Sequence, residues 1–287
     1  MNLKQFLVEP GTRIKLSDYD TGYTGGESRK KAEKKFKRDA KCLAELQNML
    51  YAGKKYAVLG IEQAMDGAGK DSAVNRLTRY INTVGMSTVS YGAPTEEELA
   101  HDFLWRHRTQ TPRPGHIRFW IRSHYEEVGI VRVHPEFLEK RGIQRTSCDD
   151  ALWEKRYSEI NAFEQSLAGS GIMVMKFFIH ISQEEQAKQL LERIDDPTKH
   201  WKFNPRDIEE RALWPHYMPA YEKAISATSM SWAPWYIIPG DHRWFARRVM
   251  ANIFVKRMER LGLEYPKLSK EKRAELARLR KQLMHEK

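Results

Sequence analysis

The stretch YAVLGIEQAMDGAGKDS, residues 56–72, decides which fold the sequence predicts. Its first part, residues 56–61, is a short apolar run typical of a buried parallel strand. A glycine-containing turn follows, and residues 71–83 continue as a predicted helix. A strand that passes through such a turn into a helix is a usual setting for phosphate binding, because small residues expose backbone N–H groups and the helix N-terminus carries partial positive charge.

The turn supplies a compact set of candidates for phosphate binding. Lys70 can reach the outer phosphates as a point charge. The match to the pattern G-x-x-x-x-G-K-[ST] is incomplete, since Ala64 stands at the first glycine and Asp71 at the Ser/Thr that usually holds magnesium. We assign to phosphate binding the residues of the turn and the first helical positions: Gly67, Ala68, Gly69, Lys70, Asp71 and Ser72.

Asp66 places an additional carboxylate inside this turn. A carboxylate among phosphates is unfavourable unless it binds a metal ion or a proton. We therefore predict that Asp66 is a catalytic residue and a magnesium ligand. A chance glycine turn between strand and helix is the competing interpretation, and the combination of strand, helix, Lys70 and Asp66 argues against it.

The rest of the chain repeats the alternation of strand and helix. Strands separated by helix-length segments predict a parallel sheet with helices on both faces, an α/β fold. Ser182, with Glu185 three residues later, has the pattern of a reciprocal capping box at the start of a helix. The further predicted strands are 86–91, 116–121, 172–180 and 235–239, the further helices are 28–50, 95–107, 153–167 and 242–261, and the segment 132–150 is predicted to be irregular.

Three parts of the chain differ in character. Residues 1–27 are predicted to form an N-terminal arm, residues 28–265 the phosphate-binding domain, and residues 266–287 a charged C-terminal helix. Within the domain, the segment 195–212 interrupts the alternation and is rich in charged and aromatic residues. Inserted segments of this kind often cover the site of an α/β protein, so we predict a helical lid there.

The charge of the chain favours a polyanionic partner. Lys and Arg number 49 and Asp and Glu 38, which gives a net charge of +11. A basic surface with no specific partner is the alternative. No apolar run approaches the ~18 residues of a membrane span, so no membrane-spanning segment is expected. Cys42 and Cys148 lie far apart without metal-ligand spacing, which indicates reduced thiols in a cytoplasmic protein.

An ordered series of motifs carries a family resemblance. The chain resembles the second family of polyphosphate kinases, in particular the subgroup that acts on both nucleoside mono- and diphosphates. The resemblance covers residues 5–265 and keeps the order and spacing of the motifs. They are QAMDGAGKD (63–71), APTEEEL (93–99), HDFLWR (101–106), RSHYEEV (122–128), VRVHP (131–135), KFFIHIS (176–182), DDPTK (195–199), WKF (201–203) and APWY (233–236).

This resemblance implies a polyphosphate-dependent nucleotide kinase. Such an enzyme transfers a phosphoryl group reversibly between inorganic polyphosphate and nucleotides (AMP, ADP and ATP, or GMP, GDP and GTP) with the help of Mg²⁺. The resemblance further implies a three-layer α/β/α P-loop kinase-like fold with a helical lid, and a homodimer or homotetramer. Polyphosphate gives the positive charge a natural partner, so nucleic acid is not expected as one.

Charged residues outside the turn complete the predicted site. Arg122 is the candidate for stabilising charge on the transferring phosphoryl group, as a fork-shaped donor can, and Arg132 is assigned a similar role. Glu126 matches a family acid near the nucleotide phosphates or the metal. Four basic residues around the lid are predicted to line a polyphosphate channel, with a solvated charged face as the alternative for each: Arg193, Lys199, Lys202 and Arg211.

Ile121 departs from the family pattern, in which this strand ends in Asp or Asn directly before Arg-Ser. An aliphatic side chain can neither ligate magnesium nor accept a hydrogen bond. If Ile121 lies near the phosphates, a polar residue there should raise turnover, whereas an isoleucine that packs against a helix should not be replaced without loss of stability. Two other functions stay open: an ATP-dependent nucleoside-monophosphate kinase, and a weakened or inactive polyanion-binding P-loop protein.

Overall fold

A parallel five-stranded sheet forms the centre of the described residues. The structure, a computed structural model, describes residues 1–143 and 149–285. The strands lie in the order β2-β3-β1-β4-β5, and every neighbouring pair is parallel. Their bounds are β1 (Ala57–Gln63), β2 (Met86–Ser90), β3 (Ile117–Ile121), β4 (Ile172–His180) and β5 (Trp235–Pro239). The parallel α/β fold predicted from the sequence is therefore confirmed.

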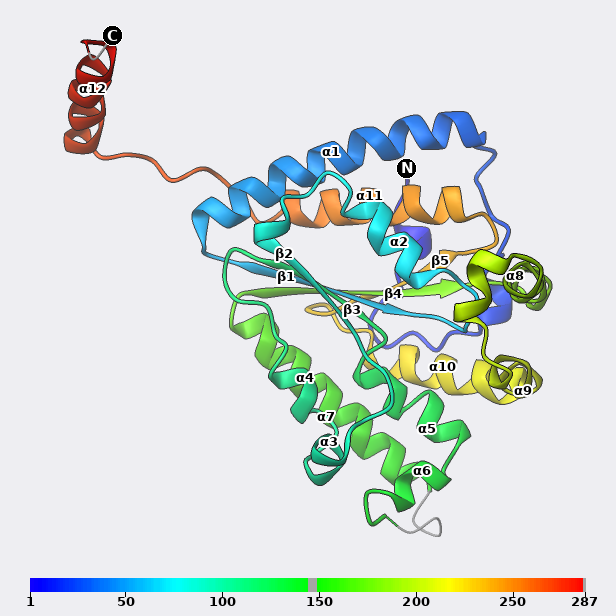
Figure 1. Ribbon diagram of the computed structural model, residues 1–287. Coiled ribbons are helices and arrows are strands. Elements are labelled where there is room, and N and C mark those ends of the chain that lie inside the picture. The colour runs from blue at the N-terminus through cyan, green and yellow to red at the C-terminus, as the bar shows by residue number, and fades with distance from the viewer. Residues whose placement is uncertain (144–148, 286–287) are drawn as a thin grey trace.

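Helices cover both faces of the sheet, so the fold has three layers (Figure 1). On one face lie α1 (Arg29–Gly53), α2 (Lys70–Leu77) and α11 (Arg243–Glu259), and on the other lie α7 (Asp150–Gly169) and α10 (Trp214–Thr228). A separate cluster of buried apolar side chains fills each side. Because helices exclude water from both faces, every residue of the central strand β1 is buried.

The predicted lid segment, residues 195–212, folds as η6 (Pro197–Lys202) and α9 (Arg206–Ala212), and with the preceding α8 (Gln183–Asp195) it forms a lid near the C-terminal ends of the strands (Figure 1). Helix α8 begins where expected, since the Ser182 hydroxyl accepts a hydrogen bond from the N–H of Glu185 at 3.0 Å. The reciprocal half of the predicted capping box is wrong. The N–H of Ser182 donates instead to the Asp241 carboxylate at 2.8 Å, which ties the start of α8 to the chain after β5.

The single helix predicted over residues 95–107 is also wrong. Two short helices, α3 (Glu96–Ala100) and α4 (Trp105–Arg108), take its place. Between them, the Asp102 carboxylate accepts a hydrogen bond from the N–H of Leu104 at 3.0 Å. An Asp that bonds to the backbone two residues later offers a local alternative to the helix, so the chain turns here.

Short helices also occur in the segment 132–150, which was predicted to be irregular. Residues 144–148 of that segment, including Cys148, lie outside the described residues. Cys42 is a free thiol.

The short helices not yet named are η1 (Lys4–Phe6), η2 (Leu16–Asp18), η3 (Thr83–Gly85), η4 (His124–Glu127), α5 (Ile130–Val133) and α6 (Glu136–Glu139).

The first residues of the chain run along the outer edge of β5. Leu7 forms an antiparallel bridge with Tyr236, and the N–H of Val8 donates to the carbonyl oxygen of Trp235 at 3.0 Å. The Phe6 and Val8 side chains are buried. An uncovered edge strand presents unpaired N–H and C=O groups, so this N-terminal segment closes the sheet at β5.

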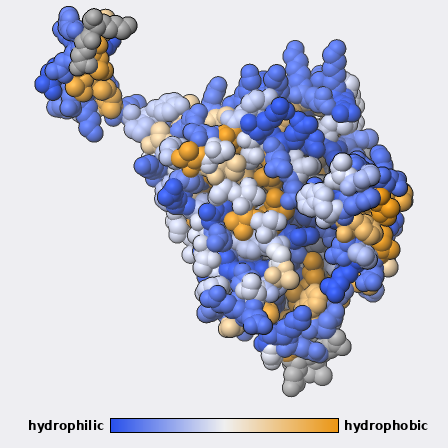
Figure 2. Space-filling view, viewed as in Figure 1, coloured by the Kyte–Doolittle hydropathy of each residue, from blue (hydrophilic) through white to orange (hydrophobic). Residues whose placement is uncertain are grey.

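At the other end of the chain, α12 (Lys270–His285) stands apart from the body of the molecule (Figure 1). Figure 2 shows apolar side chains gathered along this helix. Leu276, Leu279 and Leu283 are exposed on it. The helix therefore contributes nothing to the two cores that hold the sheet.

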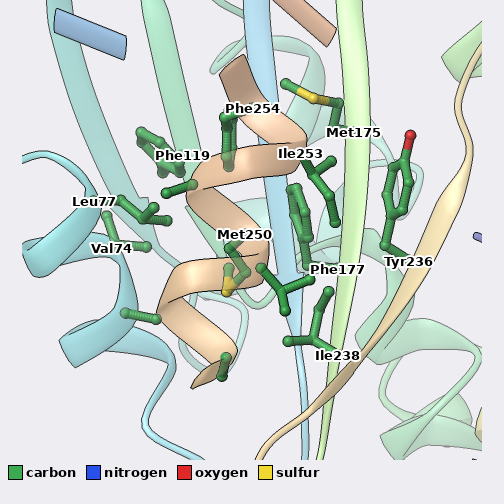
Figure 3. Close-up of a cluster of buried hydrophobic side chains, with 14 of the residues drawn as sticks. Val74, Leu77, Phe119, Met175, Phe177, Tyr236, Ile238, Met250, Ile253 and Phe254 are labelled. Atoms are coloured by element: carbon green, nitrogen blue, oxygen red, sulfur yellow. The ribbon is translucent and has the colours of Figure 1, made fainter. Parts of the chain in front are cut away.

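Close packing under β1 requires a glycine. A β-carbon at Gly60 would lie 2.8 Å from Phe254 Cζ of α11, too close for a real contact, and 3.0 Å from Phe119 Cδ1 of β3, closer than most real contacts. Figure 3 shows Phe119 and Phe254 beside each other, together with Val74 and Leu77 of α2. The missing side chain thus lets α11 and the Phe119 ring of β3 approach strand β1. This strand leads into the glycine-containing turn at residues 64–69, called the phosphate turn from here on.

A buried ionic network holds the opposite face. Lys176 of β4 donates to the carboxylate of Glu164 on α7 at 2.5 Å and to the hydroxyl of Tyr125 at 2.8 Å. The same carboxylate lies 3.1 Å from His124 Nε2 and accepts a hydrogen bond from Tyr125 at 2.9 Å. Burial raises the pKa of Glu164, but the nearby Lys176 and His124 together outweigh it and the net pKa is lowered. The network fixes the segment after β3, which carries Arg122.

We predict that Glu164→Gln lowers the free energy of unfolding by about 3–5 kcal/mol, because it keeps the shape but leaves the Lys176 ammonium buried without a counter-charge. Urea denaturation followed by circular dichroism measures the loss. Glu159→Gln is the matched control: it lies on the same helix, its carboxylate is exposed, and it should change stability by less than about 0.5 kcal/mol. Equal losses in the two variants would show that the network contributes no special stability.

Candidate active site

The phosphate turn lies at the C-terminal end of the central strand, where parallel α/β sheets usually bind their ligands. Strand β1 ends at Gln63 and helix α2 begins at Lys70. Gly67 and Gly69 have φ values of +88° and +86°, a left-handed conformation that favours glycine. The turn can therefore wrap tightly at the N-terminus of α2, as the sequence predicts.

Lys70 is folded under this turn. Its side chain is buried, and Nζ donates hydrogen bonds to the carbonyl oxygens of Ala64 at 2.8 Å and Met65 at 3.3 Å. Nζ also lies 3.8 Å from the Asp66 carboxylate. Burial lowers the pKa of Lys70, and the nearby Asp66 opposes the shift. The ammonium group is thus held at the turn, beside the place where phosphates would bind.

Arg122 reaches the turn from the end of β3. Its Nη2 lies 3.1 Å from Asp66 Oδ1, and its backbone N–H donates to the carbonyl oxygen of Glu62 at 3.0 Å. Burial raises the pKa of Asp66, but Lys70 and Arg122 outweigh it and the net pKa is lowered. Arg122 has a φ of +61°, rare for a residue with a side chain, and such strain concentrates at functional sites. The three predicted catalytic residues therefore lie together.

A cavity of about 180 Å³ opens on the Arg122 side of the turn. Asp66, Arg122 and Glu126 line it, so Glu126 shares this cavity with two of the predicted catalytic residues. Two aromatic side chains of α10, Tyr217 and Tyr221, line its wall. Lid residues complete the lining: Asn204, Arg206, Asp207 and Glu210.

The lid is bonded directly to the phosphate turn. Gln186 of α8 donates from its side-chain amide to the backbone oxygen of Asp66 at 2.9 Å. Arg211 of α9 donates to the side-chain oxygen of Gln186 at 3.0 Å and to the backbone oxygen of Gln183 at 2.7 Å. This chain of contacts couples the position of α9 to the shape of the turn.

The four basic lid residues do not form the predicted channel in this structure. Arg193 pairs with Asp207 at 2.9 Å, and Arg211 makes the backbone and amide contacts described above. Lys199 pairs with Glu192 at 2.6 Å, and Lys202 lies 4.9 Å from the ring centre of Trp201. None of the four lines either cavity beside the turn in the described part of the chain.

Arg132 also lies away from the turn. Its guanidinium donates to the Tyr157 hydroxyl at 2.9 Å and to the Asp150 carboxylate at 3.2 Å, and it stacks over the Trp153 ring. All three partners belong to α7. In this structure Arg132 therefore anchors α5 to α7.

A basic groove on the other side of the turn was missed by the sequence analysis. This cavity, of about 590 Å³, lies between α1, α2, α8 and α11. Arg243 donates to the backbone oxygen of Gly67 at 3.1 Å, and Arg247 donates to the Ser72 hydroxyl at 3.2 Å. Acidic residues Glu33, Glu185 and Asp241 also line the groove. Its cations are Arg29, Lys37, Arg76, Arg79, Lys188, Arg243 and Arg247.

Like charges crowd this basic groove. Burial lowers the pKa of Arg247, and the neighbouring cations Arg76 and Arg243 lower it further. Such crowding is favourable only with an anionic ligand between the charges. The sequence held a faint signal, since Arg76 and Arg79, and likewise Arg243 and Arg247, are spaced to share one face of a helix. Nothing in the sequence alone brings the two helices together.

Ile121 lies in the apolar cluster between the sheet and α2, where it is buried. This placement favours the packing interpretation of Ile121 over a direct phosphate contact. Its register partner on β1 is Glu62, whose side chain is fully buried. Within the described residues, neither oxygen of the Glu62 carboxyl group has a hydrogen-bond partner.

The acidic residues around the turn bear on the expected magnesium ion. Within the described residues, no three His, Cys, Asp or Glu side chains form a ready metal cluster. Magnesium in kinase sites uses one or two carboxylates together with substrate phosphates, so such a cluster is not required. Asp66 at the turn, Asp71 at the first turn of α2 and the unpartnered Glu62 supply carboxylates of the kind that magnesium prefers.

Comparison with known proteins gives a consistent result over nearly the whole chain. The family model described as polyphosphate kinase 2 matches residues 26–265. An ADP-polyphosphate phosphotransferase of Rhodopseudomonas palustris is 40% identical over 283 residues and covers 98% of each chain. An AMP/ADP-polyphosphate phosphotransferase of Meiothermus ruber is 39% identical over 268 residues, 92% of this chain and 96% of that protein.

A solved structure agrees with the fold. The crystal structure of polyphosphate kinase 2 from Arthrobacter aurescens superposes with a TM-score of 0.87 at 34% sequence identity, over 96% of both chains. Among the described residues, no helix combines the length and the apolar character needed to cross a membrane. The resemblance drawn from the ordered motifs is therefore confirmed.

We predict that Lys70→Ala lowers the rate of phosphoryl transfer by roughly 10²–10³-fold, because it removes a fixed cation from the place where phosphate charge develops. The loss corresponds to about 3–4 kcal/mol in the transition state. Steady-state kinetics measure it, with circular dichroism as the check on folding. Activity within a factor of about three of the parent would remove Lys70 from the site.

We further predict that His134 stabilises the lid more at low pH. Its Nε2 lies 2.9 Å from Glu210 of α9, and its Nδ1 lies 3.0 Å from Glu136. Burial lowers the pKa of His134, but the bonds to Glu210 and Glu136 outweigh it and the net pKa is raised. A raised pKa means that the stabilisation is full below the unfolded pKa and is lost as the pH rises through the folded one.

The measurement is the melting temperature of the parent and of His134→Gln from about pH 5.5 to about pH 8. The difference between the two proteins should be largest at the acid end and shrink as the pH rises. His285→Gln, on the exposed helix α12, is the control and should show no such trend. A pH-independent difference at position 134 would contradict the prediction.

Proposed function

This chain belongs to the polyphosphate kinase 2 family, and we propose that it transfers phosphoryl groups reversibly between inorganic polyphosphate and nucleoside mono- and diphosphates. One observation carries the proposal: the phosphate turn separates two cavities of different character. The larger is crowded with cations, and the smaller joins acidic, basic and aromatic groups. A donor and an acceptor could then meet at the turn from opposite sides.

The basic groove suits the polyphosphate chain. A polymer with charge on every phosphate needs spaced cations and no shape-specific contacts, which the arginines and lysines of α1, α2 and α11 provide. Arg243 and Arg247 lead from the groove to the turn through their bonds to Gly67 and Ser72. The terminal phosphates would then lie at the N-terminus of α2, close to Lys70.

The smaller cavity suits the nucleotide. Arg122 can bind its phosphate group as a two-pronged donor, and the Tyr217 and Tyr221 rings offer apolar surface to the nucleoside. Asp207 and Glu210 of the lid line the same cavity, where Asp207 is paired with Arg193 and Glu210 is bonded to His134. The lid closes the cavity from above, which would exclude water as a competing acceptor.

Transfer in this arrangement is direct, from one bound phosphate group to the other. Lys70 and Arg122 offset the negative charge of the transferring group, and Asp66 holds both cations in place. Magnesium, when bound, neutralises charge on the phosphate oxygens, and Asp66 and Asp71 would hold it. A homodimer or homotetramer that acts in the cytoplasm is part of the proposal, on the strength of the family resemblance.

Two other functions compete with this one. An ATP-dependent nucleoside-monophosphate kinase needs the turn and the smaller cavity, but it gives no role to the basic groove. An inactive polyanion-binding protein needs the groove, but it gives no role to the strained Arg122 and its ion pair with Asp66. Purified protein with magnesium, AMP, ADP, GMP or GDP, and either polyphosphate or ATP as donor separates the three.

We predict that Arg247→Ala raises the KM for long polyphosphate by about 10-fold, which corresponds to the loss of about 1.4 kcal/mol of binding. The KM for ADP should stay within a factor of about two. Arg206→Ala, at the edge of the smaller cavity, is the matched control and should do the reverse. Both constants come from steady-state kinetics at several salt concentrations.

Salt separates the two ligands further, because a polymer that releases many counterions binds more weakly as ionic strength rises. The slope for polyphosphate should be steeper than the slope for ADP, and Arg247→Ala should flatten it. If Arg247→Ala raises both KM values equally, or if ATP supports turnover as well as polyphosphate does, the assignment of the basic groove is wrong.

A further inference from the structure

Glu62 is an acid in the middle of an apolar environment. It belongs to β1, where every residue is buried, and its side chain has no exposed surface. In the described part of the chain, both oxygens of its carboxyl group lack a hydrogen-bond partner. A buried polar group without a partner is unfavourable, so the Glu62 carboxyl group calls for an explanation, and a bound ion is one that its chemistry fits.

The position of Glu62 on the sheet shows which way its side chain points. Alternate residues of a strand face the same side, so Glu62 faces the side that Gly60 faces. The missing β-carbon of Gly60 is directed at Phe254 of α11, and the register partner Ile121 lies in the cluster that includes Val74 of α2. Glu62 therefore points to the α2 side of the sheet.

The charged groups near Glu62 show where its carboxyl group lies. Burial raises the pKa of Glu62, the negative charge of Asp71 raises it further, and Lys70 opposes both. Asp71 and Lys70 form the first turn of α2. The Glu62 carboxyl group thus lies beneath the N-terminus of the helix that carries the phosphate turn, with a second carboxylate nearby.

Among the described residues, the cation that opposes the raised pKa of Glu62 is Lys70, and its ammonium group is already engaged. Lys70 donates to the backbone oxygens of Ala64 and Met65 and lies 3.8 Å from Asp66. Phosphates bound at the turn would bring more negative charge towards Glu62 and Asp71. Two carboxyl groups beside phosphates are favourable with a divalent cation between them, because magnesium binds through one or two carboxylates and substrate phosphates.

We propose that Glu62 supplies a further carboxylate to the divalent-cation site at the phosphate turn, in addition to Asp66 and Asp71. In this chain the acid comes from the central strand β1, beside the aliphatic Ile121 of β3, which cannot supply it. Glu62 is thereby assigned to the site although no phosphate-loop pattern includes its position. The inference rests on the proposed function for the identity of the ion, a magnesium ion bound with phosphates.

Glu62→Gln is the test, because it keeps the size of the side chain and removes the ionisable group. The full-length protein is titrated with Mn²⁺ in the presence of tripolyphosphate and without nucleotide, and free Mn²⁺ is followed by electron paramagnetic resonance. Mn²⁺ affinity should fall by about 10-fold or more. The melting temperature without metal should stay the same or rise, since an unpartnered acid is lost.

Glu159→Gln is the matched control, with the same change of charge on the exposed side of α7. Its Mn²⁺ affinity should equal that of the parent. Equal affinity of Glu62→Gln and the parent would overturn the proposal. So would a Glu62→Gln protein that melts at a clearly lower temperature without metal, because a structural role for the acid would then explain its burial.

The metal titration involves no turnover, so it is independent of the donor and the acceptor. If the parent binds Mn²⁺ through Glu62 but transfers phosphate from ATP alone, the cation site holds and the proposed polyphosphate activity fails. If polyphosphate supports transfer but Glu62→Gln binds Mn²⁺ normally, the proposed function holds and the role of Glu62 is wrong.

Discussion

The burial of strand β1 between two helical layers is the constraint on which the site depends. Because strands lie on both sides and helices on both faces, a ligand can approach β1 only at an end, and the phosphate turn starts at its C-terminal end. Gly60 allows this burial by letting Phe254 and Phe119 approach. The same tight packing makes an acid at Glu62 conspicuous, because water cannot satisfy it.

The two faces of the sheet differ in the side chains that pack around this strand. On the α7 face, the network of Lys176 and Glu164 fixes the segment after β3 and so presents Arg122 to the turn. On the α11 face, the packing is apolar under the sheet and strongly basic at its rim. One face therefore holds Arg122 in place, and the other brings together cations from separate helices.

The lid acts on the phosphate turn, which lies between the two cavities, through hydrogen bonds rather than through its basic side chains. Gln186 donates a hydrogen bond to the backbone oxygen of Asp66, and Arg211 donates one to Gln186. The position of the lid and the shape of the turn are therefore coupled. Ion pairs neutralise Arg193 and Lys199, which explains why a lid that is rich in basic residues is not a polyanion channel in this structure. A basic side chain can bind an anionic ligand freely only if it is not already paired with an acidic side chain of the protein.

The sequence by itself determined the parallel α/β fold, the phosphate turn and the candidates Asp66, Lys70 and Arg122, because strand and helix periodicity and turn chemistry are local properties. The ordered motifs also identified the family. Only the tertiary structure decided where isolated charges lie. It joined Arg243 and Arg247 to the turn and placed Arg132 against α7. Within the described residues, it also left the Glu62 carboxyl group without a hydrogen-bond partner. The physical reason is that a charge acquires its role from partners far along the chain, and packing alone chooses those partners.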